Sequence, residues 1–238
     1  MNVEQPVDIQ EPVGVVGQLS DFHQKGMTTA GVPAVTAAAV VNVGGVFLFE
    51  LKETEKMLVS TCRLSKVLQL TLAIIKPDAV AHPLMLEALH QKILDNKFVI
   101  VRCKDLVWRR QDSEKFYAEH SGRFFYQRLV EFMSSGPMRA YVLAREDAIR
   151  HWRELMGPTK VFRARYTSPS SIRAQFGLTD TRNTTHGSDS VESAQREIRF
   201  FFADFCVEEW MEKEEPLFRS GQLHYDHGKQ IHTPLAQS

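Results

Sequence analysis

The chain has 238 residues, of which 43% are apolar, so it can bury one sizeable core. Its 29 basic and 29 acidic residues cancel, which argues against general binding to nucleic acid or to a membrane surface. The three cysteines are far apart and form no CxxC pair, which favours a reducing compartment and excludes a disulfide framework.

Residues 1–68 have no sustained hydrophobic periodicity, and we interpret them as an N-terminal extension that is poorly ordered or serves in targeting. The longest apolar stretch, residues 31–49, approaches the length of a membrane span, but proline, asparagine and glycine interrupt it. These interruptions favour a loosely ordered or hairpin-forming segment, so no membrane span is expected.

The start of the chain also bears on its location. Acidic residues come before any basic one, which is unlike a secretory signal or an organelle transit peptide. A chain that began at Met57 would instead open with Arg63, Lys66 and two serines in a segment without acids, a weakly transit-like pattern. We therefore expect a mitochondrial or cytoplasmic protein, not a secreted one.

Regular hydrophobic patterns begin at Leu70. The apolar run 70–76 predicts a buried strand, and His82-Pro83 opens a helix whose apolar face ends near residue 96. Residues 98–108 alternate between apolar and basic side chains, which predicts a strand with one solvated face.

Two helical segments follow, a short one at 113–120 and a longer one at 124–133 that ends before Ser135-Gly136-Pro137. Residues 139–144 predict a third strand. The apolar spacing within 148–156 then predicts another amphipathic helix.

A long polar segment, residues 157–188, precedes the last predicted helix, for which Asp189 and Glu192 indicate a capping box. The apolar run 199–205 predicts the fourth strand, and residues 206–238 are expected to form an acidic C-terminal tail. This order of elements predicts an α+β, ferredoxin-like βαββαβ fold, in which helices cover a four-stranded antiparallel sheet.

The chain lacks the motifs GxxxxGK[ST], GxGxxG, HExxH and GxSxG, so any phosphate chemistry must rely on side chains. Lys76 ends the first strand, and Arg153 and Arg173 flank or lie within the polar segment that leads to His186. Arginine forks match phosphate oxygens, and an oriented imidazole can carry a phosphoryl group. These residues point to phosphoryl transfer through His186, with Glu197 on the following helix to orient it.

Residues 183–194, NTTHGSDSVESA, resemble the active-site signature of nucleoside diphosphate kinases. Further blocks of that family occur in the same order: Lys76-Pro77-Asp78, Arg123-Phe124-Phe125, Ser135-Gly136-Pro137 and Ser171-Ile172-Arg173. The resemblance covers residues 69–205, which we predict to be the kinase domain. The sequence of residues 178–186 is most similar to that of a divergent, mitochondrial-type branch of the family.

The resemblance implies that ATP donates its γ-phosphate to nucleoside diphosphates by a ping-pong mechanism through phospho-His186. It implies three catalytic residues, namely His186, Glu197 as its orienting partner, and Lys76 at the transferring phosphate and the ribose. The cofactor that it implies is Mg²⁺, held by the nucleotide phosphates and not by a dedicated set of protein ligands.

The resemblance also implies which residues bind the nucleotide. The nucleotide-binding residues that it implies are Lys76, Tyr117, Phe125, Arg153, Thr159, Arg173, Asn183 and Ser188. Within this set, Phe125 stacks on the base, Asn183 reaches the sugar hydroxyl and Ser188 supports Glu197. Phe125 lies on the apolar stripe of its helix, however, and equally suits core packing, as does Tyr117.

The sequence leaves an alternative function open. The connection between Thr159 and Arg173 is longer than in the common hexameric members of the family and lacks their Lys-Pro-Gly motif. The oligomeric state is therefore open, and a protein partner or a homo-oligomer are both compatible with the chain. The alternative is a weakly active or inactive kinase fold that acts as a regulatory binding partner, or that senses nucleotides without turnover. No cysteine and no regular helix lie near His224, His227 and His232 in the sequence, so we interpret them as part of a solvated tail and not as a metal site.

Overall fold

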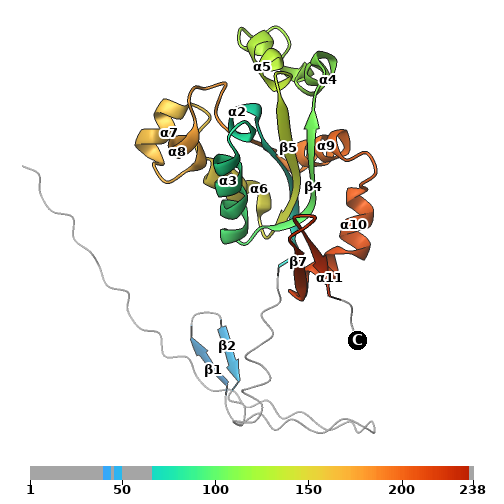
Figure 1. Ribbon diagram of the computed structural model, residues 1–238. Helices are drawn as coiled ribbons and strands as arrows, with labels where there is room; N and C mark the ends of the chain where they lie inside the picture. Colours follow the sequence, from blue (N-terminus) through green and yellow to red (C-terminus); the bar gives the residue numbers. More distant parts are fainter. Residues whose placement is uncertain (1–39, 44–45, 50–65, 236–238) are drawn as a thin grey trace, which may run out of the picture. The chain divides into compact units, whose positions relative to one another are not determined.

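The computed structural model describes residues 40–43, 46–49 and 66–235 (Figure 1). The chain divides into two units, Met1–Ser60 and Thr61–Ser238.

The described part of the first unit is a hairpin. Its strands β1 (Val40–Val43) and β2 (Val46–Phe49) pair antiparallel, with Val40 opposite Phe49. The structure thus contains the hairpin that was one of the two expectations for residues 31–49, while the rest of the predicted extension up to residue 65 lies outside the described residues. Across the described ranges, no helix is both long and apolar enough to cross a membrane.

The second unit is built on a four-stranded sheet. Its strands are β3 (Gln69–Ile75), β4 (Val99–Val107), β5 (Pro137–Arg145) and β6 (Thr185–Gly187). They lie in the order β4-β5-β3-β6, and every neighbouring pair is antiparallel. The predicted α+β class with the βαββαβ order is confirmed.

The helices between these strands follow the expected order. They are α2 (Pro77–Val80), α3 (Pro83–Asp95), α4 (Arg110–Phe116), the 3-10 turn η1 (Ala118–His120), α5 (Tyr126–Met133) and α6 (Ala148–Met156). The polar segment 157–188 contains two further short helices that periodicity did not predict, α7 (Val161–Thr167) and α8 (Ile172–Phe176).

Both faces of the sheet are covered. Side chains alternate along a strand, so Leu72 and Ile74 of β3 join the core beneath α9 (Val191–Phe201), while Ala73 and Ile75 join the core beneath α3 and α6. Because neither face of β3 is solvated, its sequence is a continuous apolar run and not an alternating one.

The prediction of the fourth strand was wrong. Residues 199–205 do not form a strand, because Ile198 and Phe201 bury the same face of α9 as Ala194 at helical spacing. The fourth strand is β6, which is short and polar and is defined by its pairing with β3. The predicted capping box also differs, since α9 begins after Ser190, whose Oγ accepts a hydrogen bond from the Ser193 backbone N–H at 3.1 Å.

The segment after residue 206 is folded in the structure. It forms α10 (Val207–Lys213), α11 (Glu215–Arg219) and the antiparallel hairpin of β7 (Leu223–Asp226) and β8 (Ile231–Pro234).

This segment is tied to the domain core, although His224 and His227 within it are exposed and only His232 is half-buried. Trp210 is 1% exposed in the core that contains α9. The Leu68 backbone N–H donates to Glu215 Oε1 at 2.8 Å, and the Ile100 backbone N–H donates to His232 Nδ1 at 2.9 Å. A few widely spaced apolar side chains outweigh the acidic composition here, because each one reaches the core of the domain.

Candidate active site

His186 lies on β6, the strand at one edge of the sheet, opposite Ile74 of β3. Its backbone carbonyl accepts a hydrogen bond from Trp152 Nε1 at 3.1 Å, which links the strand to α6. The imidazole is 22% exposed, so it is both constrained by its surroundings and accessible to a ligand.

The small residue after the histidine has a packing cause. A Cβ atom on Gly187 would lie 2.3 Å from Cδ1 of Trp152, which is far inside contact distance. Glycine therefore lets the indole of α6 pack directly against the strand that carries His186.

Glu197 orients the imidazole from the second turn of α9. Its Oε2 lies 3.0 Å from His186 Nε2 and accepts a second hydrogen bond from Ser188 Oγ at 2.7 Å. Burial raises the pKa of this carboxyl, but the hydrogen bonds from His186 and Ser188 outweigh it and leave the pKa below its ordinary value. An ionised Glu197 requires the proton of His186 to be on Nε2, which leaves the Nδ1 lone pair as the nucleophile.

A buried lysine lies at the end of β3. Lys76 is 5% exposed, and its Nζ donates to Asn183 Oδ1 at 2.6 Å. Burial, and secondarily the charge of Arg173, lower the pKa of Lys76 to about 7, against the opposing effect of Asp78. Asp78 accepts the backbone N–H of Thr184 at 3.0 Å and so fixes the turn before β6.

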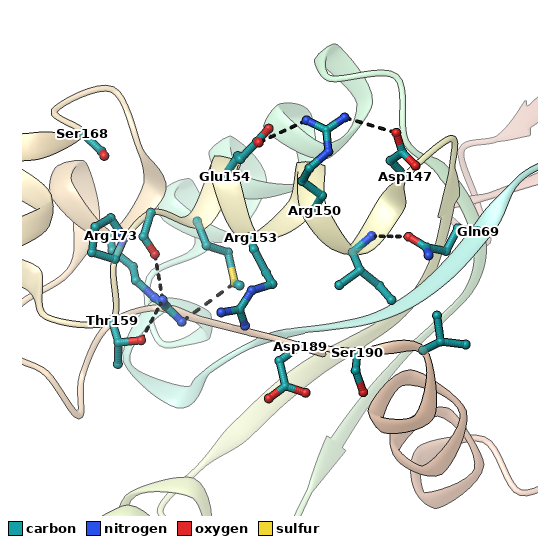
Figure 2. A pocket seen from close by; sticks show the side chains of 15 residues that line it. Gln69, Asp147, Arg150, Arg153, Glu154, Thr159, Ser168, Arg173, Asp189 and Ser190 are labelled. Atoms are coloured by element: carbon teal, nitrogen blue, oxygen red, sulfur yellow. Dashed lines mark hydrogen bonds and ion pairs between the residues drawn. The ribbon is translucent and has the colours of Figure 1, made fainter. Parts of the chain in front are cut away.

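Two arginines approach from α6 and α8 (Figure 2). Arg173 is 8% exposed and donates to the carbonyls of Gly157 and Thr185 at 2.9 and 3.0 Å, and to Thr159 Oγ1 at 3.5 Å. Burial and the charge of Arg153 lower the pKa of Arg173 to about 10, so it stays a cation at neutral pH. Arg153 itself is exposed, and it forms no side-chain hydrogen bond or ion pair with any residue that the structure describes.

Aromatic side chains form another wall of the site. The Phe116 ring meets the imidazole of His186 edge-on at a centroid distance of 5.5 Å, and Tyr117 does so at 6.4 Å. The Tyr117 hydroxyl is buried without a hydrogen-bond partner among the described residues, and its burial raises its pKa. Phe125, half-buried at the start of α5, packs against the ring of His120.

These groups enclose a cavity of about 680 Å³. Nine of the ten residues that the sequence assigned to the site line it: Lys76, Tyr117, Phe125, Arg153, Thr159, Arg173, Asn183, His186 and Glu197. Ser188 does not line it and lies beneath Glu197, fully buried. Five basic side chains line this cavity with the histidine, namely Lys76, Arg128, Arg153, Lys160 and Arg173, and such a cavity suits a polyanionic ligand.

Three contributors were missed as site residues. Trp152 was assigned only to the core, Phe116 was not singled out, and Asp78 was noted only as part of a sequence block. Trp152 and Phe116 act by tertiary packing, for which their local sequence contains no signal. Asp78 belongs to the block Lys76-Pro77-Asp78 that the sequence analysis noted. Its hydrogen bond with the turn before β6, however, could not be predicted without the fold.

Comparison with known proteins identifies this arrangement. The family model for nucleoside diphosphate kinase matches residues 69–207. A Danio rerio protein named nucleoside diphosphate kinase 6 is 73% identical over 171 residues, covering 72% of this chain and 97% of the relative. The Homo sapiens protein of that name is 65% identical over 173 residues, covering 73% of this chain and 93% of the relative.

Solved structures agree with this assignment. The nucleoside diphosphate kinase of Aquifex aeolicus is 44% identical with a TM-score of 0.55, covering 60% of this chain and 98% of that one. The enzyme of Halobacterium salinarum in complex with CDP is 29% identical with a TM-score of 0.53, covering 60% and 97%. The chain therefore belongs to the nucleoside diphosphate kinase family, and within it resembles the proteins named nucleoside diphosphate kinase 6.

Proposed function

We propose that this protein transfers the γ-phosphate of ATP to other nucleoside diphosphates by a ping-pong mechanism through phospho-His186. The observation that carries the proposal is the hydrogen bond between His186 Nε2 and Glu197 Oε2, which leaves Nδ1 free on a ring that lines a cavity with basic side chains. The residues proposed as catalytic are His186, Glu197 and Lys76, in the roles that the sequence predicts.

In the first step, the Nδ1 lone pair of His186 forms a bond to the γ-phosphorus of ATP. The bond from that phosphorus to the bridging oxygen breaks, and its electron pair leaves on the β-phosphate of ADP. Positive charge develops on the ring and is stabilised by the carboxylate of Glu197, while Lys76, Arg153 and Arg173 stabilise the charge on the phosphoryl oxygens. A second nucleoside diphosphate then takes the phosphoryl group by the reverse of this step.

The rest of the nucleotide has room along the same cavity. Thr159 and Arg173 lie together where phosphates would bind, and Asn183 contacts Lys76, where a sugar hydroxyl would bind. We assign the base to the aromatic end at Phe125, with Tyr117 beside the histidine. Ser188 acts only through Glu197.

The donor set fits Mg²⁺ that arrives with the nucleotide. Among the described residues, no three His, Cys, Asp or Glu side chains are grouped to ligate a metal ion. Glu197 is engaged by His186 and Ser188, whereas Glu119, Asp180 and Asp189 line the cavity with exposed side chains. Of these three we assign Asp189, three residues after His186, to hold a water of the hydrated ion. The metal would neutralise charge on the phosphates.

A single-turnover experiment tests the proposal. The full chain is mixed with γ-labelled ATP and Mg²⁺, and we expect an acid-labile, base-stable phosphoprotein that loses its label when unlabelled GDP is added. His186→Ala should take up no label, whereas His224→Ala, an exposed histidine on β7, should match the wild type. Normal transfer by His186→Ala would refute the assignment.

A second candidate function has its own observation. Phe162 and Tyr166 on α7 are 71% and 74% exposed and pack against each other at 5.0 Å, an unusual exposure for two aromatic rings on a surface helix. Such a surface favours a partner or a homo-oligomer, with the kinase fold weakly active alone. The molar mass in solution decides between a monomer and an assembly, and labelling of the isolated chain decides whether it works without a partner.

We further infer that the kinase domain occupies residues 69–205, preceded by an extension at 1–68, and that the protein acts in mitochondria or cytoplasm. Deleting residues 1–56 and locating the remaining chain in cells tests whether a start at Met57 is enough for targeting.

A further inference from the structure

A second cavity, of about 840 Å³, adjoins the active-site cavity at its aromatic end. Arg128, Asp180 and Thr181 line both cavities and therefore mark the boundary between them. Arg128 lies one turn after Phe125 on α5, so the boundary is next to the side chain on which the base is proposed to stack.

Arg128 and Asp180 have opposite charges but do not pair. Arg128 forms no hydrogen bond or ion pair with any residue in the described part of the chain, and its side chain is exposed. Asp180 uses Oδ1 to accept the backbone N–H of Val161 at 3.2 Å, which leaves Oδ2 for a ligand. A donor group and an acceptor group thus border the same space with a gap between them.

Asp180 is also fixed relative to the phosphate end of the site. Its backbone carbonyl accepts a hydrogen bond from Asn183 Nδ2 at 3.0 Å. The Oδ1 atom of the same amide accepts the hydrogen bond from Lys76 Nζ at 2.6 Å. One asparagine side chain therefore sets the distance between the phosphate-binding lysine and the carboxylate at the base end.

We propose that Arg128 and Asp180 determine base specificity and make this site prefer guanine over adenine nucleotides. This inference rests on the proposed function, which puts the phosphates at His186 and the base at Phe125. Guanine presents O6 and N7 as acceptors, which arginine binds in a bidentate manner, and N1–H and the 2-amino group as donors for a carboxylate. Adenine presents its 6-amino donor to the arginine and its N1 acceptor to the carboxylate, so both pairs are mismatched.

Binding affinities test this proposal without requiring turnover. Calorimetric titration of the full chain with GDP, ADP and IDP in the presence of Mg²⁺ should give a dissociation constant about tenfold lower for GDP than for ADP. IDP keeps O6, N7 and N1–H but lacks the 2-amino group, so its affinity should fall between the two.

Two substitutions separate the two contacts. Arg128→Gln should bring the GDP affinity close to that of ADP, and Asp180→Asn should do the same while its amide oxygen still accepts the Val161 N–H. Arg163→Gln is the matched control, because Arg163 is an exposed arginine of α7 that lines neither cavity. It should leave the GDP preference unchanged.

Equal affinities for GDP and ADP, or a preference that survives both substitutions, would overturn the inference. Phosphate transfer through His186 without any base preference would do so while leaving the proposed function intact. A GDP preference that depends on Arg128 and Asp180 in a chain that forms no phosphohistidine would support the inference and refute the proposed function.

Discussion

Lys76 is the residue at which the site and the stability of the fold conflict. Its pKa falls from 10.5 to about 7 on folding, chiefly because it is buried. Between these two values the unfolded chain binds the proton and the folded chain does not. Stability therefore rises with pH across that window, by about 1.4 kcal/mol per pH unit, and the cost of charging Lys76 is fully present below about pH 7.

We predict that Lys76→Met removes this dependence. The variant should be more stable than the wild type near neutral pH, and its advantage should shrink as the pH rises towards 10.5. Phosphate transfer should fall by about 100-fold or more, because a donor aimed at the transferring phosphate is lost. Denaturant unfolding at several pH values measures the difference in stability between the variant and the wild type. Lys115→Met removes an exposed lysine on α4 and leaves Lys76 in place, so it should keep the pH dependence of the wild type, and equal behaviour of the two variants would contradict the burial argument.

Gly187 gives a second prediction at the scale of a residue. Gly187→Ala places a methyl group 2.3 Å from Trp152 Cδ1, so the fold should lose about 1–3 kcal/mol of stability. Phosphohistidine formation should also slow, because the strand carrying His186 must shift. Gly136→Ala is the control, since a Cβ there meets nothing nearer than Pro77 Cβ at 3.6 Å. Thermal unfolding compares the two variants, and equal melting temperatures would show that the indole relaxes freely.

The site was more predictable from the sequence than its supports. His186, Glu197 and Lys76 lie in ordered sequence blocks, and nine of the ten predicted residues line one cavity. Their catalytic and binding roles stay predictions. Phe116 and Trp152 could not be found in this way, because edge-on packing on an imidazole and a hydrogen bond to a strand carbonyl depend on where distant elements meet.

At the scale of elements, predictions succeeded where burial produces a clear period. Strand β3 and helix α3 were placed within a residue or two, because long apolar patterns define them. Strand β6 was missed because three residues contain no pattern, and only pairing with β3 makes them a strand. The aromatic residues at the end of α9 were misread as a strand, since a short apolar run fits either period.

The start of α9 allows a test of the corrected cap. Ser190→Ala removes the acceptor for the Ser193 N–H and should cost about 1 kcal/mol. Asp189→Ala should cost less, because the Asp189 carboxylate accepts from the Ser193 hydroxyl and not from a backbone N–H of the helix. Chemical denaturation of both variants ranks them. A larger loss for Asp189→Ala would restore the cap that the sequence predicted.

At the scale of the whole molecule, the C-terminal segment is packed more closely than its acidic sequence indicates. Val207, Trp210 and Phe218 are each at most 5% exposed in the core beneath α9. Glu215 is 2% exposed and receives both the Leu68 N–H and the guanidinium of Arg219 at 3.2 Å. The composition of the segment could not reveal this packing, because three apolar side chains are enough to attach it when each one is buried in the core of the domain.

The last prediction follows from that packing. Because α9 carries Glu197 and shares its core with Trp210, removing the support beneath α9 should weaken the whole domain and not only its end. Trp210→Ala should cost about 3–5 kcal/mol, whereas Leu217→Ala, on the neighbouring helix and 42% exposed, should cost less than about 1 kcal/mol.

Denaturant unfolding, followed both by far-UV circular dichroism and by phosphohistidine formation, measures the stability of the two variants. If unfolding involves the domain as one unit, activity and helical signal are lost together in Trp210→Ala. A variant that loses signal early but keeps activity to the wild-type midpoint would mean that the C-terminal segment unfolds separately, and that the kinase domain ends near residue 205 as the sequence predicts.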